Sequence, residues 1–218
     1  MKIANIETFL VSNFLIVRIT EDNGIQGVWE SCYWSYPKSA EETILGFKDT
    51  LIGIDSRNIE HIWNLLWRNN SSFRGNSLSS AISAIDIALW DIKGKRLNAP
   101  IWDLLGGKVR NKVRAIAQGV NGKTPEEFAE KVNSLKEKGF TAVKFTPMPS
   151  DWPKYTYSKL MDVSANIVKA VRNKVGVDFD IAIEIHRNMR PHEAIVFSNE
   201  IEKNKPNKIQ APKQPHTL

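Results

Sequence analysis

Two short segments place side chains of complementary chemistry at the ends of predicted strands. In the segment AVKFTP, Lys144 and Thr146 are separated by one residue, and in DIAIEIH, Glu184 and His186 have the same spacing. Side chains two positions apart on a strand point to the same side, so each segment presents a polar pair on one face and apolar residues on the other. A carboxylate beside a histidine could bind a hard divalent cation such as magnesium and transfer a proton.

Each of these residues also has an interpretation that requires no chemistry. The ammonium group of a lysine near the mouth of a parallel sheet often simply reaches solvent. Glu184 could form a surface ion pair with Arg187 or Arg190. A glutamate and a histidine at this spacing also arise often by chance, so the residues alone leave both interpretations open.

The second half of the chain is expected to alternate strands and helices, which would bring these pairs together. In chain order, the expected elements cover 113–120, 125–138, 141–146, 157–173, 179–185 and 191–203. Thr124 and Pro125 open the first helix with a capping residue and a proline at its first position. The alternation predicts a parallel sheet with right-handed crossovers, whose strand ends carry the chemistry.

The first half of the chain predicts a hairpin followed by helices. Asp22, Asn23 and Gly24 separate two strand-like segments and are typical of a tight hairpin turn. A helix is expected over 40–52, after a capping box that begins at Ser39, and a second is expected to begin near Ser56. The clearest helix begins at residue 78. Its apolar stripe consists of Leu78, Ala81, Ile82, Ile85, Ala88, Leu89 and Ile92, the period of a helix packed on a core.

Composition and charge exclude several classes of protein. The chain has 218 residues with a net charge of +6, but four lysines lie in its last 16 residues, and without them it has 26 basic and 24 acidic residues. A nearly neutral body does not indicate nucleic-acid binding. No apolar run approaches the length of a membrane span, so no membrane partner is expected. The single cysteine, Cys32, excludes an internal disulfide and favours a reducing, cytoplasmic location.

The long central helix also carries a family resemblance. The segment SAIDIALWDIKGK at 83–95, followed by LLGG at 104–107, resembles the signature segment of the mandelate racemase/muconate-lactonising branch of the enolase superfamily. The segments GVWES at 27–31 and FRG at 73–75 are similar to that family's capping domain. The resemblance covers residues 1 to about 204.

The resemblance implies a fold for each part of the chain. Residues 1–108 would form an α+β capping domain. Residues 109–204 would form the first part of an α/β domain, an incomplete (β/α)8 barrel with about three parallel strands. Residues 205–218 would be an irregular basic tail. We therefore expect a chain truncated partway through the barrel, with an open sheet edge that leaves a homo-oligomer possible.

The resemblance also implies an activity, closest to the acid-sugar dehydratases. Glu184 matches a ligand of the family's Mg²⁺ ion, which three carboxylates hold. Lys144 matches the first lysine of a Lys-x-Lys motif and is expected, with His186, to be catalytic by steadying the anionic substrate. A base would remove the proton α to the carboxylate of a sugar acid, and magnesium would stabilise the enediolate. His186, as imidazolium, would protonate the departing β-hydroxyl. Capping loops near Trp34 and Arg74 would contact the substrate.

The chain departs from the family pattern at two positions. Thr146, also expected near the substrate, stands where racemases carry a lysine base, which disfavours the alternative of a racemase or cycloisomerase. Gln210 aligns with the next carboxylate ligand and offers only a neutral amide. We therefore expect weak or absent Mg²⁺ binding and no turnover by this chain. The rival hypothesis is a non-catalytic fragment or assembly module.

Overall fold

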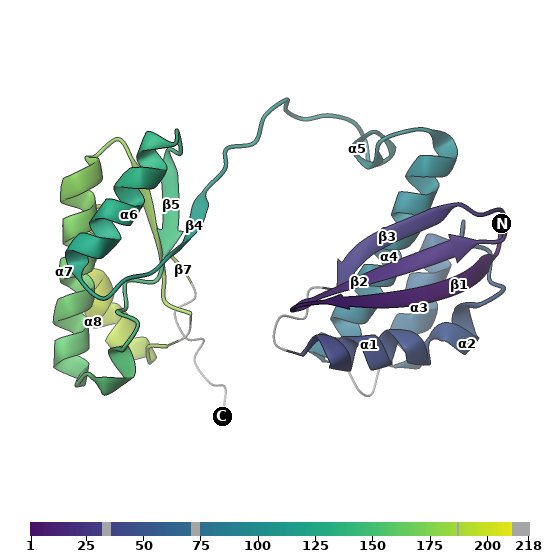
Figure 1. Ribbon diagram of the computed structural model, residues 1–218, viewed down its shortest axis with the longest axis horizontal. Coiled ribbons are helices and arrows are strands. Elements are labelled where there is room, and N and C mark those ends of the chain that lie inside the picture. The colour runs from purple at the N-terminus through teal and green to yellow at the C-terminus, as the bar shows by residue number, and fades with distance from the viewer. Residues whose placement is uncertain (32–35, 71–74, 187, 211–218) are drawn as a thin grey trace. The chain divides into compact units, whose positions relative to one another are not determined.

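The computed structural model describes residues 1–31, 36–70, 75–186 and 188–210. The chain forms two compact units, Met1–Asn111 and Lys112–Leu218, and each has its own apolar core (Figure 1). None of the helices in the described part of the chain has the length and apolarity that a bilayer crossing requires.

The first unit begins with an antiparallel sheet in the order β1-β2-β3. Its strands are β1 (Ile3–Val11), β2 (Phe14–Glu21) and β3 (Gln26–Ser31). The predicted hairpin turn joins the last two strands: the N–H of Gly24 donates to the carbonyl of Glu21, and Gly24 has a φ of 86°. Such a positive φ favours glycine, which explains the residue at this position.

The helices of the first unit cover one face of that sheet. They are α1 (Pro37–Gly46), α2 (Lys48–Leu51), α3 (Ile59–Asn69), α4 (Asn76–Leu97) and α5 (Ile101–Leu104). Every residue of the apolar stripe predicted for α4 is buried. The helix expected over 40–52 is instead two helices and begins earlier, at Pro37, because a proline is favourable at the first helical position. Ser39 therefore caps nothing, and its hydroxyl donates to the Ser77 hydroxyl.

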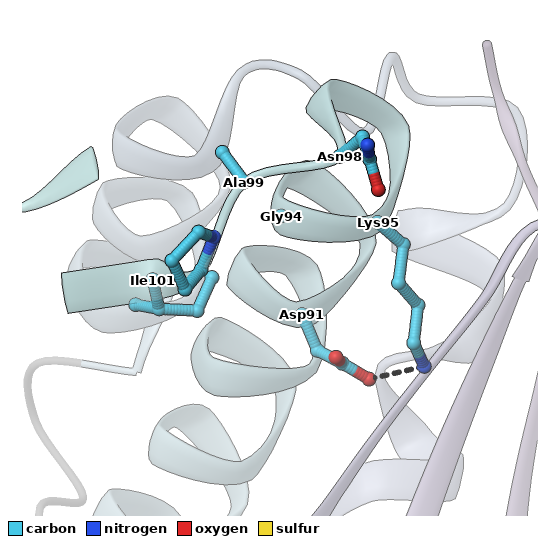
Figure 2. A pocket seen from close by; sticks show the side chains of 7 residues that line it. Asp91, Gly94, Lys95, Asn98, Ala99 and Ile101 are labelled. Carbon is cyan, nitrogen blue, oxygen red and sulfur yellow. Dashed lines mark hydrogen bonds and ion pairs between the residues drawn. The ribbon is translucent and has the colours of Figure 1, made fainter. Parts of the chain in front are cut away.

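The last turns of α4 hold the edge strand β3. Asp91 Oδ2 accepts from the backbone N–H of Val28 at 3.0 Å, and Lys95 Nζ donates to the carbonyl of Gln26 at 2.8 Å. The two side chains also pair with each other at 2.7 Å, as Figure 2 shows. An unpaired strand edge is a template for aggregation. Asp91 and Lys95 occupy two backbone groups of β3 that would otherwise be open to another chain.

Two glycines allow backbone segments to approach α4 closely. A Cβ atom at Gly27 would lie 2.0 Å from the carbonyl oxygen of Ala88, so any other residue would push β3 away from the helix. A Cβ atom at Gly94 would lie 2.8 Å from Ile101 Cδ1, where the chain turns back after α4 (Figure 2). Both glycines belong to the segments that carry the family resemblance. Close packing against α4 therefore explains why these segments have glycine at these two positions.

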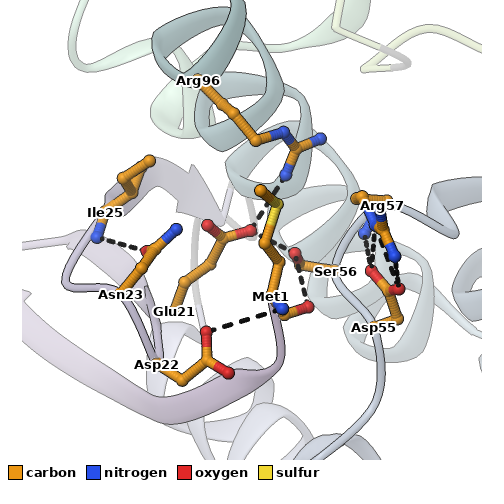
Figure 3. A network of polar contacts seen from close by, with 9 residues as sticks. All are labelled: Met1, Glu21, Asp22, Asn23, Ile25, Asp55, Ser56, Arg57 and Arg96. Atoms are coloured by element: carbon orange, nitrogen blue, oxygen red, sulfur yellow. Dashed lines mark hydrogen bonds and ion pairs between the residues drawn. The ribbon is translucent and has the colours of Figure 1, made fainter.

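A buried carboxylate joins the sheet to the helices of the first unit. The side chain of Glu21 is fully buried, and its Oε1 accepts hydrogen bonds from the Ser56 hydroxyl and from Arg96 Nη1, the latter at 3.0 Å (Figure 3). Ser56, expected near the start of a helix, instead serves this network, and α3 begins at Ile59.

The second unit is a parallel sheet in the order β4-β5-β6-β7 with helices on one face (Figure 1). Its elements are β4 (Ala117–Val120), α6 (Pro125–Glu137), β5 (Ala142–Phe145), the 3-10 helix η2 (Trp152–Lys154), α7 (Tyr157–Val175), β6 (Asp180–Glu184), α8 (Pro191–Glu202) and β7 (Lys208–Gln210). The predicted cap of α6 is present, since Thr124 Oγ1 accepts from the N–H of Glu127.

Two expectations about this sheet are wrong. The first strand begins at Ala117 rather than at residue 113, because Val113 is 80% exposed and the described backbone pairing with β5 begins only at Ala117. The segment expected to be irregular after residue 205 contains a fourth strand, β7. The N–H of Asn207 donates to the Ile181 carbonyl, and the N–H of Ile185 donates to the Gln210 carbonyl, so β7 pairs with β6.

The buried network of Figure 3 yields a stability prediction. Replacing Arg96 with Met should lower the free energy of unfolding of the first unit by about 3 kcal/mol, because it leaves the fully buried Glu21 carboxylate without its cation. Urea unfolding followed by tryptophan fluorescence measures the change. The matched control is Arg57→Met, which breaks the arginine pair with Asp55 at a side chain that is 59% exposed. Equal effects of both substitutions would contradict the account.

Candidate active site

The polar residues predicted to act together lie on the face of the second sheet opposite its helices. Val143, Phe145, Ile181, Ile183 and Ile185 belong to the core beneath α6, α7 and α8. Strand alternation therefore turns Lys144 and Glu184 to the other face. The register pairs Lys144 with Ala182, and it pairs Glu184 with Gln210.

Lys144 and Glu184 form an ion pair between adjacent strands. Lys144 Nζ lies 3.4 Å from Glu184 Oε2. The Glu184 side chain is only 6% exposed, and that of Lys144 is 22% exposed. Burying a carboxylate requires compensation, and this one receives it from the ammonium group and from the backbone N–H of His186, which donates to Oε1 at 3.1 Å.

This pairing bears on the alternatives that the sequence left open. Glu184 is buried and contacts Lys144, so it is not a surface carboxylate. Arg190 instead caps α8, where its backbone N–H donates to Glu193 Oε2. Arg187, the other suggested partner, lies outside the described residues.

His186 contacts Thr146 from the neighbouring strand end. Thr146 Oγ1 lies 3.2 Å from His186 Nδ1, and the histidine is exposed. The expected strand periodicity does not produce this contact, since β5 ends at Phe145 and β6 at Glu184. His186 has a φ of 50°, a left-handed conformation that is uncommon outside glycine. The turn after β6 therefore aims the imidazole, and the hydrogen bond orients its Nδ1.

The two residues expected to contact a substrate from the capping loops are Trp34 and Arg74. Both lie outside the described residues. Of the predicted site residues, the structure therefore brings together four: Lys144, Thr146, Glu184 and His186.

The described residues do not by themselves fit a Mg²⁺ ion. Among them there is no group of three or more His, Cys, Asp or Glu side chains placed to hold a metal. Within the four described strands, Glu184 is the only carboxylate at a carboxyl end, and it is already paired with Lys144. Its partner in register, Gln210, offers an amide oxygen without charge. Mg²⁺ requires near-octahedral oxygen ligands and a balancing negative charge, which these residues alone do not supply.

Sequence reasoning missed Arg172, which positions β7. Its guanidinium donates to the carbonyls of Gly176 and Phe179 before β6, and to those of Asn204 and Lys205 before β7, at 2.6 to 2.9 Å. Burial lowers the pKa of this arginine, which nevertheless stays charged. Because one side chain joins both turns, it fixes where β7 starts and therefore which residue faces Glu184. An arginine in a helix offers no sequence signal for this role.

Comparisons with known proteins match both units. Residues 2–106 match the family model of the mandelate racemase / muconate lactonizing enzyme, N-terminal domain. A D-galactonate dehydratase from Klebsiella pneumoniae is 33% identical over 213 residues, which are 97% of this chain and 55% of that protein. The chain thus spans about half the length of this curated relative.

Solved structures extend the comparison to the fold. A protein from Zymomonas mobilis ZM4, provisionally assigned as a dehydratase, is 31% identical with a TM-score of 0.92, over 99% of this chain and 62% of that one. An enolase from Agrobacterium radiobacter, provisionally assigned as a galactarate dehydratase, has bound sodium and L-malate. It is 29% identical with a TM-score of 0.88, over 100% of this chain and 56% of that one.

The role of Arg172 can be tested by hydrogen exchange. In Arg172→Met, the amides of Ile185 and Asn207, which bond across β6 and β7, should exchange at least about tenfold faster, because the turns that align these strands are released. The amide of Ser150, which bonds to the carbonyl of Gly122 and lies away from the turns that Arg172 holds, should keep its protection. Lys169→Met, at an exposed position of the same helix, is the control. Unchanged exchange at Ile185 and Asn207 would contradict the assignment.

Proposed function

Because the chain belongs to the mandelate racemase/muconate-lactonising branch of the enolase superfamily, we propose that it supplies the capping domain and the first catalytic strands of a sugar-acid dehydratase. The observation that carries the proposal is the arrangement of Lys144, Glu184, Thr146 and His186 at one edge of the parallel sheet. Residues at the carboxyl ends of parallel strands are where such folds place their chemistry.

His186 is proposed as the general acid. Its Nδ1 is held by the Thr146 hydroxyl, which leaves Nε2 directed away from that contact. As imidazolium, the ring would give the Nε2 proton to the β-hydroxyl of the substrate, so that the hydroxyl leaves as water. A general base removes the α-proton, and we do not assign this base to any of the described residues. The resulting enol tautomerises to a 2-keto-3-deoxy acid, which balances the reaction.

Lys144 and Glu184 are proposed to position the substrate. The ammonium group is 22% exposed and has three donor hydrogens, of which the contact with Glu184 occupies one. It can therefore also meet the carboxylate of a sugar acid. The Glu184 carboxylate is proposed to accept a hydrogen bond from a substrate hydroxyl. The relatives named for galactonate and galactarate support this substrate class.

Thr146 argues against racemase chemistry. A racemase needs a base that takes up and returns the α-proton, and a hydroxyl without an activating partner cannot do so. Here the Thr146 hydroxyl contacts an imidazole that is proposed as an acid. The two reactions are distinguished by proton NMR in D₂O: a dehydratase forms keto acid, whereas a racemase returns deuterated substrate epimerised at the α-carbon.

The 218-residue chain by itself should form no keto acid from D-galactonate, D-gluconate or galactarate, with or without Mg²⁺. The reason is that the described residues provide neither an α-proton base nor a metal-binding set of carboxylates. A keto-acid assay over this panel measures the outcome. Turnover by the chain alone would show that it holds a complete site.

A chimera tests whether the chain's own residues are catalytically competent. Residues 1–210, carrying Gln210→Glu so that a second carboxylate stands beside Glu184, would be joined to the portion of the Klebsiella D-galactonate dehydratase that follows its matched segment. The chimera should dehydrate D-galactonate, and His186→Asn should lower kcat at least about 100-fold, since it removes the acid. His192→Asn, at an exposed histidine of α8, is the matched control and should keep full activity.

The rival hypothesis of a non-catalytic module makes the opposite prediction. A chimera that folds, as judged by circular dichroism and a cooperative thermal transition, but forms no keto acid would favour it. Activity that is equal in His186→Asn and in the parent chimera would contradict the assigned acid while leaving the fold assignment in place.

A further inference from the structure

The edge of the second sheet carries positive charge where a divalent cation would need negative charge. Lys144 Nζ is 3.4 Å from Glu184 Oε2, and the residue in register with Glu184 on the next strand is Gln210. We propose that this edge excludes divalent cations: Lys144 is the fixed counter-ion of Glu184, and Gln210 is the residue that sets this selectivity. The inference rests on the proposed function only in taking this edge as the ligand site.

The charges of the described groups at this edge do not favour a divalent cation. The ammonium group of Lys144 neutralises the Glu184 carboxylate, so a cation arriving at Glu184 would have to displace Lys144 or share the carboxylate with it. The carboxylate is 6% exposed, and like charges repel more strongly where water is excluded. Its second oxygen already accepts the N–H of His186, which further limits its capacity as a ligand.

A second lysine strengthens this effect. Lys208 is in register with Ala182, which is itself in register with Lys144, so the two lysines flank a small residue in the same row. Ile209 packs against the core, and alternation therefore places Lys208 on the same face as Gln210. Lys144, Ala182 and Lys208 thus form the cross-strand row two residues before Glu184 on the same face. This row contributes two positive charges and no negative charge.

Gln210 is the position at which one change would reverse the selectivity. The backbone of Gln210 is fixed, because its carbonyl accepts the N–H of Ile185 at 3.1 Å. Glutamate has nearly the same size and shape as glutamine, so Gln210→Glu would place a second carboxylate in register with Glu184. One or two carboxylates completed by water are a common ligand set for Mg²⁺, so the second carboxylate creates the negative charge that the edge lacks.

The test measures metal binding by the full 218-residue chain, without any activity assay. Mn²⁺ binding is followed by electron paramagnetic resonance and Mg²⁺ binding by calorimetry. The unsubstituted chain should bind both only weakly, with dissociation constants of about 1 mM or more. Gln210→Glu should bind Mn²⁺ at least about tenfold more tightly, and adding Glu184→Gln should abolish the gain. Asn207→Glu adds the same charge at an exposed neighbouring position and should bind no more tightly than the unsubstituted chain.

A second substitution tests the counter-ion role and does not depend on the folding of Gln210→Glu. Lys144→Gln removes the cation and leaves Glu184 in place, so Mn²⁺ affinity should rise about tenfold or more. Tight, sub-millimolar binding by the unsubstituted chain would overturn the proposal. So would equal affinities of Gln210→Glu and Asn207→Glu, or no gain in Lys144→Gln. None of these outcomes depends on whether the chain belongs to a working dehydratase, which the chimera tests separately.

Discussion

The ion pair between Lys144 and Glu184 is the contact on which the candidate site depends. A carboxylate that is almost fully buried must be compensated, and the compensation here comes from two directions, an ammonium group of β5 and a backbone N–H after β6. The same N–H belongs to His186, whose ring contacts Thr146 on the neighbouring strand end. One buried charge therefore couples the ends of two strands and the turn that aims the imidazole.

Both units of the chain use the same physical device. In the first unit the fully buried Glu21 is held by Arg96 from α4, and in the second Glu184 is held by Lys144 from the adjacent strand. In each case the cation comes from an element distant in sequence. A buried carboxylate with a distant cation penalises misplacement of either element, because a shift leaves a charge uncompensated. In the second unit, Arg172 adds to this by tying the turn before β7 to the turn before β6.

The features predicted from sequence were those that local patterns determine. The apolar period of α4, the turn at Gly24 and the cap at Thr124 depend on neighbours within a few residues, and the structure confirms them. The features that were missed depend on distant partners. Residues 113–116 have strand-like composition but precede the point where β4 begins to pair with β5, whereas the three residues of β7 look like part of a polar tail yet pair with β6. The role of Arg172 follows only from the positions of backbone carbonyls.

A double-mutant cycle on Lys144 and Glu184 tests the central claim most directly. The free energy of unfolding of the second unit would be measured for the parent chain, Lys144→Met, Glu184→Gln and the double variant. If each group compensates the other, the two effects are not additive, and the coupling is at least about 1 kcal/mol. A coupling indistinguishable from zero would mean that the two side chains are independent, and the account of the site would be wrong.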